Sequence, residues 1–385
     1  MAEVLVNDFD KIFNLLKKAQ RPLILIGNGV YISQAVPVFR DLIDQCQLPC
    51  VSSLPALGAL PSDHPLSFSF VGHTGEFFAN LALFYSDLLL ALGVRLDLRQ
   101  TGSEIKDFKT NKKVVRVDID KGELDFSRIE GDINIQMDLK EFLSRFSEYL
   151  KGKKESFSYQ NWLAKIKGWE KELNSSRFYQ GKALNMYQVI KAVDDITKNR
   201  QVVVSSGVGT HQQLVARCFS FDYPRRIWLT SAGHGTMGFD IPVNIGAMLE
   251  SKPNTLGIVF VGDGSFQMNT QELATIEEYR LPIKIFVLDN SRLGIVSQFQ
   301  KLNWKRDPST GNKHNPSFSA IAKAYGLKGY DISSSEKIVP ILKEVFADDS
   351  PALVHCKVDY NEDVLPMLMG GQKLNEMYPF EEVPL

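Results

Sequence analysis

One acidic and one amide side chain mark the most informative stretch of the sequence. Asp263 lies in a Gly-Asp-Gly turn after an apolar run at residues 256–261, and Asn290 follows the next apolar run, at 284–288. In a parallel sheet the carboxyl ends of neighbouring strands open onto one crevice, where ligands of such folds bind. A carboxylate and an amide oxygen there suit Mg²⁺, which prefers about six oxygens and usually takes several from a phosphate. The spacing predicts a metal–phosphate site.

The residues around Asp263 favour the same interpretation. Gly262 and Gly264 lack side chains, which lets the main chain approach a phosphate closely. We expect a helix after Ser265 to direct its free N–H groups toward the anion. A Gly-Asp-Gly triplet alone describes many tight turns. Only the combination of strand, turn, helix, second strand and Asn290 favours a binding site over an ordinary turn.

This segment resembles the metal–diphosphate motif of thiamine-diphosphate (ThDP) enzymes. The match is closest to the acetolactate synthase family, through GDGSFQMN, QELATI, LPIKI and LGIVSQFQ. The resemblance implies that Asp263, Asn290 and the main-chain carbonyl of Arg292 bind Mg²⁺. It also implies that the cofactor diphosphate lies beside Gly262, Gly264 and Ser265.

A second loop, SGVGTHQ at residues 206–212, resembles the family's diphosphate loop. The resemblance places four residues along the phosphates: Val208, Gly209, Thr210 and His211. A glycine turn in which Thr210 caps the next helix is the ordinary alternative, and it is compatible with the same role.

A third loop, SAGHGTMGFDIPVNIG at residues 231–246, resembles the family's loop over the cofactor's pyrimidine ring. The resemblance makes Met237 the apolar wedge that bends ThDP, although an isolated methionine is usually core filler. It also implies that the Gly235 carbonyl accepts a hydrogen bond from the cofactor amino group. Thr236, between Gly235 and Met237, belongs to the same cofactor-binding loop. His234 is a candidate for contacting a substrate carbonyl, because imidazole titrates near neutral pH; a loop histidine bonded to main chain is the alternative.

Four residues depart from the family pattern, and the first is His234, which stands where the family has a leucine-like residue. Asp240 stands where the family usually has glycine, and Asp289 replaces the first asparagine of an Asn-Asn pair. Phe299 replaces a tryptophan typical of the substrate channel, which leaves the substrate open.

The elements that must position these residues follow an α/β pattern, in which short apolar runs alternate with longer periodic segments. We predict strands at 22–26, 87–92, 114–118, 202–205, 227–230, 256–261, 284–288 and 352–358. We predict helices at 8–19, 36–45, 186–197, 270–280, 318–325 and 336–346. The expected architecture is two doubly wound parallel-sheet domains: a Rossmann-like middle domain at 1–150, a connector at 151–180, a ThDP diphosphate-binding domain at 181–360 and a tail at 361–385. The tail segment 364–371 resembles the family segment that covers the active site.

The first domain carries a weaker nucleotide signal. Gly27-Asn28-Gly29 does not continue into a G-x-G-x-x-G, so a nicotinamide dehydrogenase is a poor fit. The segment resembles the start of the family's middle domain, which in acetolactate synthases holds a structural FAD. The candidate FAD residues are Gly27, Gly29, Gly72, His73, Gly93, Arg95, Asp120 and Asp132. An empty or altered site is the alternative, with surface ion pairing for the arginine and the two aspartates.

Composition narrows the function classes. The 44 basic and 45 acidic residues give a net charge of −1, which predicts neither nucleic-acid nor membrane partners. The first apolar stretch is too short to span a bilayer and the N-terminus lacks a signal-peptide pattern, so we expect a cytoplasmic protein. We interpret the four cysteines as buried free thiols.

The resemblance implies a ThDP/Mg²⁺ enzyme that decarboxylates a 2-oxo acid such as pyruvate and condenses it with a second 2-oxo acid. Met1 falls just before the middle domain, so we expect either that the chain is a fragment or that a separate polypeptide supplies the family's pyrimidine-binding domain with its glutamate. A homo-oligomer or a partner that carries that domain is therefore expected. A non-catalytic module that binds a nucleotide or diphosphate and interacts with a partner is the alternative.

Overall fold

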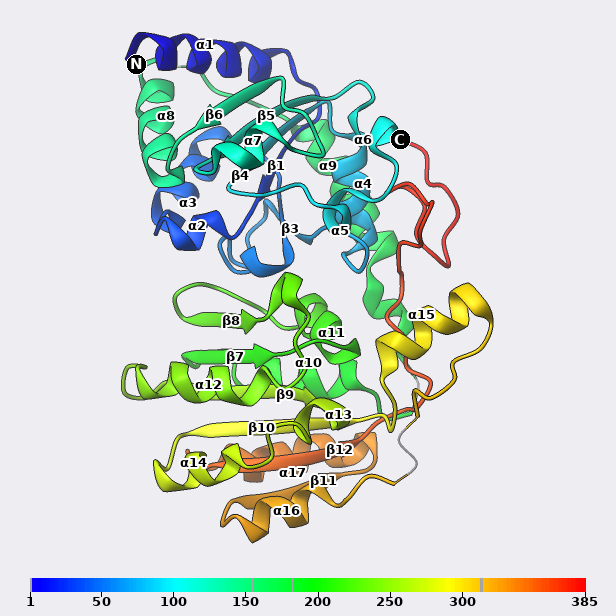
Figure 1. Ribbon diagram of the computed structural model, residues 1–385. Helices are drawn as coiled ribbons and strands as arrows, with labels where there is room; N and C mark the ends of the chain where they lie inside the picture. Colours follow the sequence, from blue (N-terminus) through cyan, green and yellow to red (C-terminus); the bar gives the residue numbers. More distant parts are fainter. Residues whose placement is uncertain (1, 154, 182, 312–313) are drawn as a thin grey trace. The chain divides into compact units, whose positions relative to one another are not determined.

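The computed structural model describes residues 2–153, 155–181, 183–311 and 314–385, and the chain forms two compact units (Figure 1). Unit 1 comprises Met1–Ser175 and Leu365–Leu385, and unit 2 comprises Ser176–Val364. Each unit contains a six-stranded sheet whose strands pair in parallel and are flanked by helices. The predicted α/β fold with two doubly wound sheets is confirmed.

The sheet of unit 1 has the order β3-β2-β1-β4-β5-β6, the order typical of dinucleotide-binding folds. Its strands are β1 (Pro22–Ile26), β2 (Cys50–Ser52), β3 (Ser67–Phe70), β4 (Leu88–Leu92), β5 (Lys113–Asp118) and β6 (Ile133–Gln136). The longer helices that contact one another form two groups: α1 (Ala2–Lys18), α3 (Val36–Cys46) and α8 (Leu139–Lys153), then α4 (Phe77–Tyr85) and α9 (Gln160–Leu173). The shorter helices are α2 (Gly29–Ile32), α5 (Leu98–Thr101), α6 (Ile105–Lys109) and α7 (Lys121–Asp125).

The sheet of unit 2 has the order β11-β12-β10-β9-β7-β8. Its strands are β7 (Val202–Ser206), β8 (Arg226–Thr230), β9 (Leu256–Gly262), β10 (Ile283–Asp289), β11 (Lys328–Ile332) and β12 (Ala352–Lys357). Strand β7 pairs with both β8 and β9, so the strand order reverses there and opens the crevice in which such folds bind ligands.

Helices cover both faces of this sheet (Figure 1). An apolar core fills the space between the sheet and α12 (Asp240–Leu249), α14 (Glu272–Glu278) and α16 (Phe318–Ala324). The remaining helices of unit 2 are α10 (Met186–Ile196), α11 (Thr210–Cys218), α13 (Asp263–Phe266), α15 (Gly294–Trp304) and α17 (Ile338–Val345). Single 3₁₀ turns occur at Leu54–Ala56, Ser175–Phe178, Ala232–His234 and Ser335–Lys337.

The sequence predicts the long buried strands β1, β4, β7, β9, β10 and β12, because their apolar runs need cover on both faces. It also predicts the half-buried edge strand β8. Strand β1 (PLILI) is buried at every position. The prediction missed β2, β3, β6 and β11. Strand β2 has only three residues, and the other three lie at sheet edges, where polar and half-exposed residues interrupt the apolar pattern.

The C-terminal segment Leu365–Leu385 packs against α4 within unit 1. The rings of Phe77 and Phe380 stack with centroids 5.2 Å apart. The Tyr85 hydroxyl donates to the Val383 carbonyl at 2.6 Å. The segment is therefore held to unit 1 by both aromatic and polar contacts. Helix α9, in the region taken from the sequence as a connector, also belongs to unit 1.

The cysteines form no disulfide, and three are buried whereas Cys218 is half-buried. Burial raises the pKa of the Cys46 thiol to about 12, so this side chain stays protonated and unreactive near neutral pH. Among the described helices, none has both the length and the apolar character needed to cross a bilayer.

Candidate cofactor site

The predicted metal residues lie at neighbouring strand ends. Strands β9 and β10 pair with Gly262 opposite Leu288, which brings the following residues, Asp263 and Asp289, to the same edge of the sheet. Asp263 is 2% exposed and Asn290 is 3% exposed. The structure therefore brings a buried carboxylate and a buried amide together at the crevice of unit 2.

The chain after Asn290 makes a tight turn. Ser291 has φ 54°, and the Asn290 Oδ1 atom accepts a hydrogen bond from the Arg292 main-chain N–H at 3.3 Å. The Arg292 guanidinium donates to Asp363 at 2.8 Å and to the Ser297 hydroxyl at 3.0 Å. Because unit 2 itself holds the guanidinium, this geometry suits the predicted role of the Arg292 carbonyl alone.

Asn315 is a residue of the site that the sequence analysis missed. Its Nδ2 atom donates to Asp263 Oδ2 and to Asp289 Oδ1, both at 2.7 Å. His355 Nε2 lies 2.8 Å from the other oxygen of Asp289. Burial alone would raise the pKa of Asp289, but hydrogen bonds from His355, Asn315 and Ser291 N–H outweigh it, so that pKa lies below its usual value.

Helix α11 begins at the same crevice. Its N-cap, Gly209, has φ 143° and no capping side chain. The Thr210 hydroxyl is buried without a hydrogen-bond partner among the described residues. A Cβ added to Gly294 would lie 2.4 Å from that hydroxyl and 2.8 Å from Asn290 Nδ2. The loop after β7 and the turn after β10 therefore approach each other closely, with the free end of α11 between them.

The histidine of this loop bridges to the turn after β9. The His211 Nδ1 atom lies 3.0 Å from the position of a Cβ at Gly209 and 3.3 Å from that of a Cβ at Gly262. The ring is buried. Glycine at both positions therefore leaves room for the imidazole between the two loops.

The loop after β8 lies against the loops that follow β7 and β9. Gly235 has φ 60°, and a Cβ there would lie 3.8 Å from the Val208 side chain. The Met237 Cε atom lies 3.4 Å from the position of a Cβ at Gly264. Met237 therefore contacts the Gly-Asp-Gly turn, as a wedge over the site would require. His234 is exposed, and its main-chain N–H donates to the Ser231 carbonyl; Thr236 is also exposed.

The oxygen atoms gathered near Asp263 suit a hard cation that also binds phosphate oxygens. Within the described parts of the chain, no three His, Cys, Asp or Glu side chains gather as a metal site. A metal at Asp263 would thus draw on amide, carbonyl and phosphate oxygens, which is typical of Mg²⁺. The helix expected after Ser265 differs in detail, because α13 is one turn that begins at Asp263 and α14 begins only at Glu272.

The candidate FAD glycines of unit 1 lie at the carboxyl edge of its sheet. A Cβ at Gly27 would lie 2.0 Å from the Gly93 carbonyl oxygen, and one at Gly29 would lie 2.8 Å from the Gly93 Cα. A Cβ at Gly72 would lie 2.2 Å from the Arg99 carbonyl oxygen. Packing of the main chain against itself thus accounts for these glycines without a ligand.

The polar FAD candidates also have partners inside unit 1. Arg95 pairs with Glu123 at 2.8 Å, Asp120 accepts from the Gly122 N–H at 2.7 Å, and the His73 N–H donates to the Arg99 carbonyl. Asp132 lies at the amino end of β6, where it accepts from the Val114 N–H at 2.9 Å. Asp132 therefore lies at the amino ends of the strands, whereas the candidate glycines lie at the carboxyl ends. We no longer count it among the candidate FAD residues.

Three apolar side chains are exposed on the loops and helices that follow the strands at the carboxyl ends of the unit 1 sheet. Ile32 is 78% exposed, Leu98 56% and Ile119 67%. These residues follow β1, β4 and β5, where doubly wound folds bind nucleotides.

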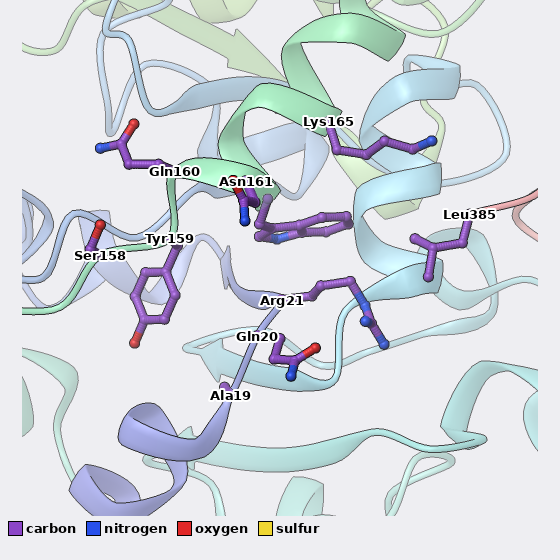
Figure 2. A pocket seen from close by; sticks show the side chains of 10 residues that line it. Ala19, Gln20, Arg21, Ser158, Tyr159, Gln160, Asn161, Lys165 and Leu385 are labelled. Carbon is purple, nitrogen blue, oxygen red and sulfur yellow. The ribbon is translucent and has the colours of Figure 1, made fainter.

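A groove of about 890 Å³ in unit 1 lies elsewhere (Figure 2). It lies beside the amino end of β1 and contains no predicted site residue. The lining includes Arg21, Tyr159, Trp162, Lys165 and Leu385.

Comparison with known proteins agrees with the geometry. Residues 207–356 match the C-terminal TPP-binding domain of thiamine pyrophosphate enzymes, and residues 9–146 match the central domain of the same enzymes. The two matches fall within the two units described above.

Curated relatives over most of the chain are acetolactate synthases. The isozyme 2 large subunit of Escherichia coli is 34% identical over 94% of this chain and 64% of its own length. The large subunit of Lactococcus lactis is 34% identical over 94% of this chain and 62% of its own. Acetolactate synthase 1 of Zea mays is 32% identical over 96% of this chain and 58% of its own length. The chain therefore spans roughly three fifths of these relatives and belongs to the thiamine pyrophosphate enzymes, whose central and TPP-binding domains it carries.

Proposed function

We propose that unit 2 binds ThDP through Mg²⁺ and serves an enzyme that decarboxylates a 2-oxo acid such as pyruvate and joins the product to a second 2-oxo acid. The observation that carries the proposal is the meeting of three loops at the ends of β7, β8 and β9 with the buried Asp263–Asn290 pair. The acetolactate synthases among the relatives favour acetolactate or a related product.

The chain's part in this chemistry is to hold and shape the cofactor. Asp263, Asn290 and the Arg292 carbonyl would bind Mg²⁺. The N-terminus of α11 would bind the diphosphate, because helix N-termini favour anions, together with the Thr210 hydroxyl, which has no hydrogen-bond partner in the described parts of the chain. Met237 would hold the cofactor bent. When bound, ThDP supplies the electron sink for the carbanion that decarboxylation leaves.

Three finer assignments belong to the same proposal. Unit 1 would hold FAD or another nucleotide against its exposed apolar side chains, with Arg95 and Asp120 at the rim. His234 would contact the substrate. The working protein would be an oligomer or a complex that provides the pyrimidine-binding part of the site.

Calorimetry of the purified chain with ThDP, with and without Mg²⁺, tests the central proposal. We expect binding that depends on Mg²⁺ and is lost in Asp263→Ala. The control is Asp349→Ala, which removes an exposed aspartate paired with Arg200 in the same unit. Wild-type affinity in Asp263→Ala would refute the metal assignment.

Two further measurements separate the finer assignments. A flavin absorbance band in the purified protein would support FAD, whereas a colourless protein that takes up no added FAD would count against it. Acetolactate formed from pyruvate would support the proposed reaction. Tight ThDP binding with no turnover of any 2-oxo acid by the assembled protein would favour the non-catalytic binding module instead.

A further inference from the structure

We infer that Asp240 is a positioning residue that fastens the three loops of the cofactor site to one another before a cofactor binds. The inference rests on the proposed function for what the loops hold, whereas the contacts are properties of unit 2. Asp240 is the first residue of α12, and its carboxylate is fully buried. A buried carboxylate is costly unless strong donors surround it.

One oxygen of Asp240 holds the diphosphate loop. Asp240 Oδ1 accepts a hydrogen bond from the Gly207 main-chain N–H. The His211 Nε2 atom lies 3.4 Å from the same oxygen. A Cβ at Gly207 would lie 2.7 Å from Oδ2, so a side chain there would push the carboxylate away. Asp240 therefore contacts the diphosphate loop at two points, one on each side of Gly209.

The other oxygen holds the two remaining loops through one hydroxyl. Ser265, in the turn after β9, donates its Oγ–H to Asp240 Oδ2. The same Oγ accepts from the Gly238 main-chain N–H at 2.8 Å, in the loop that carries Met237. A single carboxylate thus links all three loops.

The start of α12 is anchored from the sheet as well. The Ser205 hydroxyl, at the end of β7, donates to the main-chain carbonyl of Asp240 at 2.7 Å. This hydrogen bond connects the residue that carries the carboxylate directly to strand β7. Loops held in the bound geometry need less ordering when the ligand arrives, which raises affinity.

Amide hydrogen exchange on the cofactor-free chain tests the inference. In Asp240→Ala we expect the Gly207 and Gly238 amides to exchange at least about tenfold faster, because both lose the network that protects them. Exchange in β10 and β12 should stay at the wild-type rate. The affinity for ThDP with Mg²⁺ should fall by about tenfold or more, the effect of one lost hydrogen bond to a charged group.

Two milder variants divide the network. Asp240→Asn keeps an acceptor for Gly207 and places a donor beside Ser265, so it should restore slow exchange at both amides. Ser265→Ala should speed exchange at Gly238 and leave Gly207 protected. These two variants decide the inference even if the alanine variant does not fold.

Asp194→Ala is the matched control. Asp194 is a buried aspartate of the same unit that binds Arg226 at 2.6 Å and the Ser220 N–H at 3.0 Å, at the amino edge of the sheet. It should lower the Tm without a selective effect on the loops. The inference fails if Asp240→Ala gives the same exchange pattern as this control, leaves the loop amides unchanged, or is not corrected by asparagine.

The two proposals fail in different ways. A wild-type chain that does not bind ThDP with Mg²⁺ contradicts the proposed function. The exchange rates of the cofactor-free variants still decide whether Asp240 fastens the loops.

Discussion

Replacing Asn315 with leucine removes an amide that joins the carboxylate of Asp263, the predicted metal ligand, to the carboxylate of Asp289 beside it. Asn315 Nδ2 lies 2.7 Å from an oxygen of Asp263 and 2.7 Å from one of Asp289, so those oxygens are no farther apart than twice that distance. At about 5 Å and an effective dielectric constant of about 20, two unit charges repel by about 3 kcal/mol. The amide that offsets this repulsion also orients Asp263 for a cation.

We expect Asn315→Leu to weaken Mg²⁺-dependent ThDP binding by roughly 10- to 100-fold, the usual effect of losing a residue that orients a metal ligand. Without metal, the free energy of unfolding should fall by about 3 kcal/mol. Asn315→Asp should be less stable still, because it adds a third carboxylate, and saturating Mg²⁺ should narrow that gap. Calorimetry and urea unfolding with and without Mg²⁺ measure both effects. If ThDP binding by Asn315→Leu depended on Mg²⁺ as it does in the wild type, the reasoning would be refuted.

Further predictions concern both units. Gly27→Ala should destabilise the chain by about 1–3 kcal/mol in urea unfolding, because its Cβ would meet the Gly93 carbonyl; Gly168→Ala, in the open middle of α9, should stabilise it by up to about 1 kcal/mol. Burial lowers the pKa of Lys112 from 10.5 to about 7. Between pH 7 and 10.5 the unfolded chain then binds a proton that the folded chain lacks, so the free energy of unfolding should rise with pH over this range. A Lys112→Met variant whose free energy of unfolding rises just as steeply with pH would contradict this. Met237→Ala should reduce the turnover of the assembled enzyme far more than its ThDP affinity; an equal loss of both would count against a wedge.

The sequence predicts the sheets best where strands are buried on both faces. Strands β1, β9 and β10 are apolar runs because helices cover both of their sides, so composition alone marks them. The edge strands β6 and β11 carry polar and exposed residues, which no local pattern separates from loops. Their position depends on which neighbours the rest of the chain provides.

Asp263 and Asn290 were predictable as neighbours because a general rule connects them. Each follows a strand, and parallel strands end at one edge of the sheet. Asn315 follows no strand, and it reaches Asp263 across 52 residues of sequence. Its place depends on how the chain after α15 returns to the crevice, which spacing does not encode.

The glycines of unit 1 show how one pattern admits two causes. A glycine after a strand serves either a ligand or a close main-chain approach. Only the packing of Gly27 and Gly29 against Gly93 identifies the second cause for this turn.

What the sequence by itself determined is therefore the fold class, the family, and the loops that follow the buried strands, because each depends on residues close together in the chain. What the tertiary structure alone decided is which side chains hold those loops together. Asp240 was visible in the sequence only as a departure from a glycine. Its contacts with Gly207 and Ser265 arise because three strand ends and the first turn of α12 pack around one buried carboxylate, and such contacts depend on packing rather than on spacing.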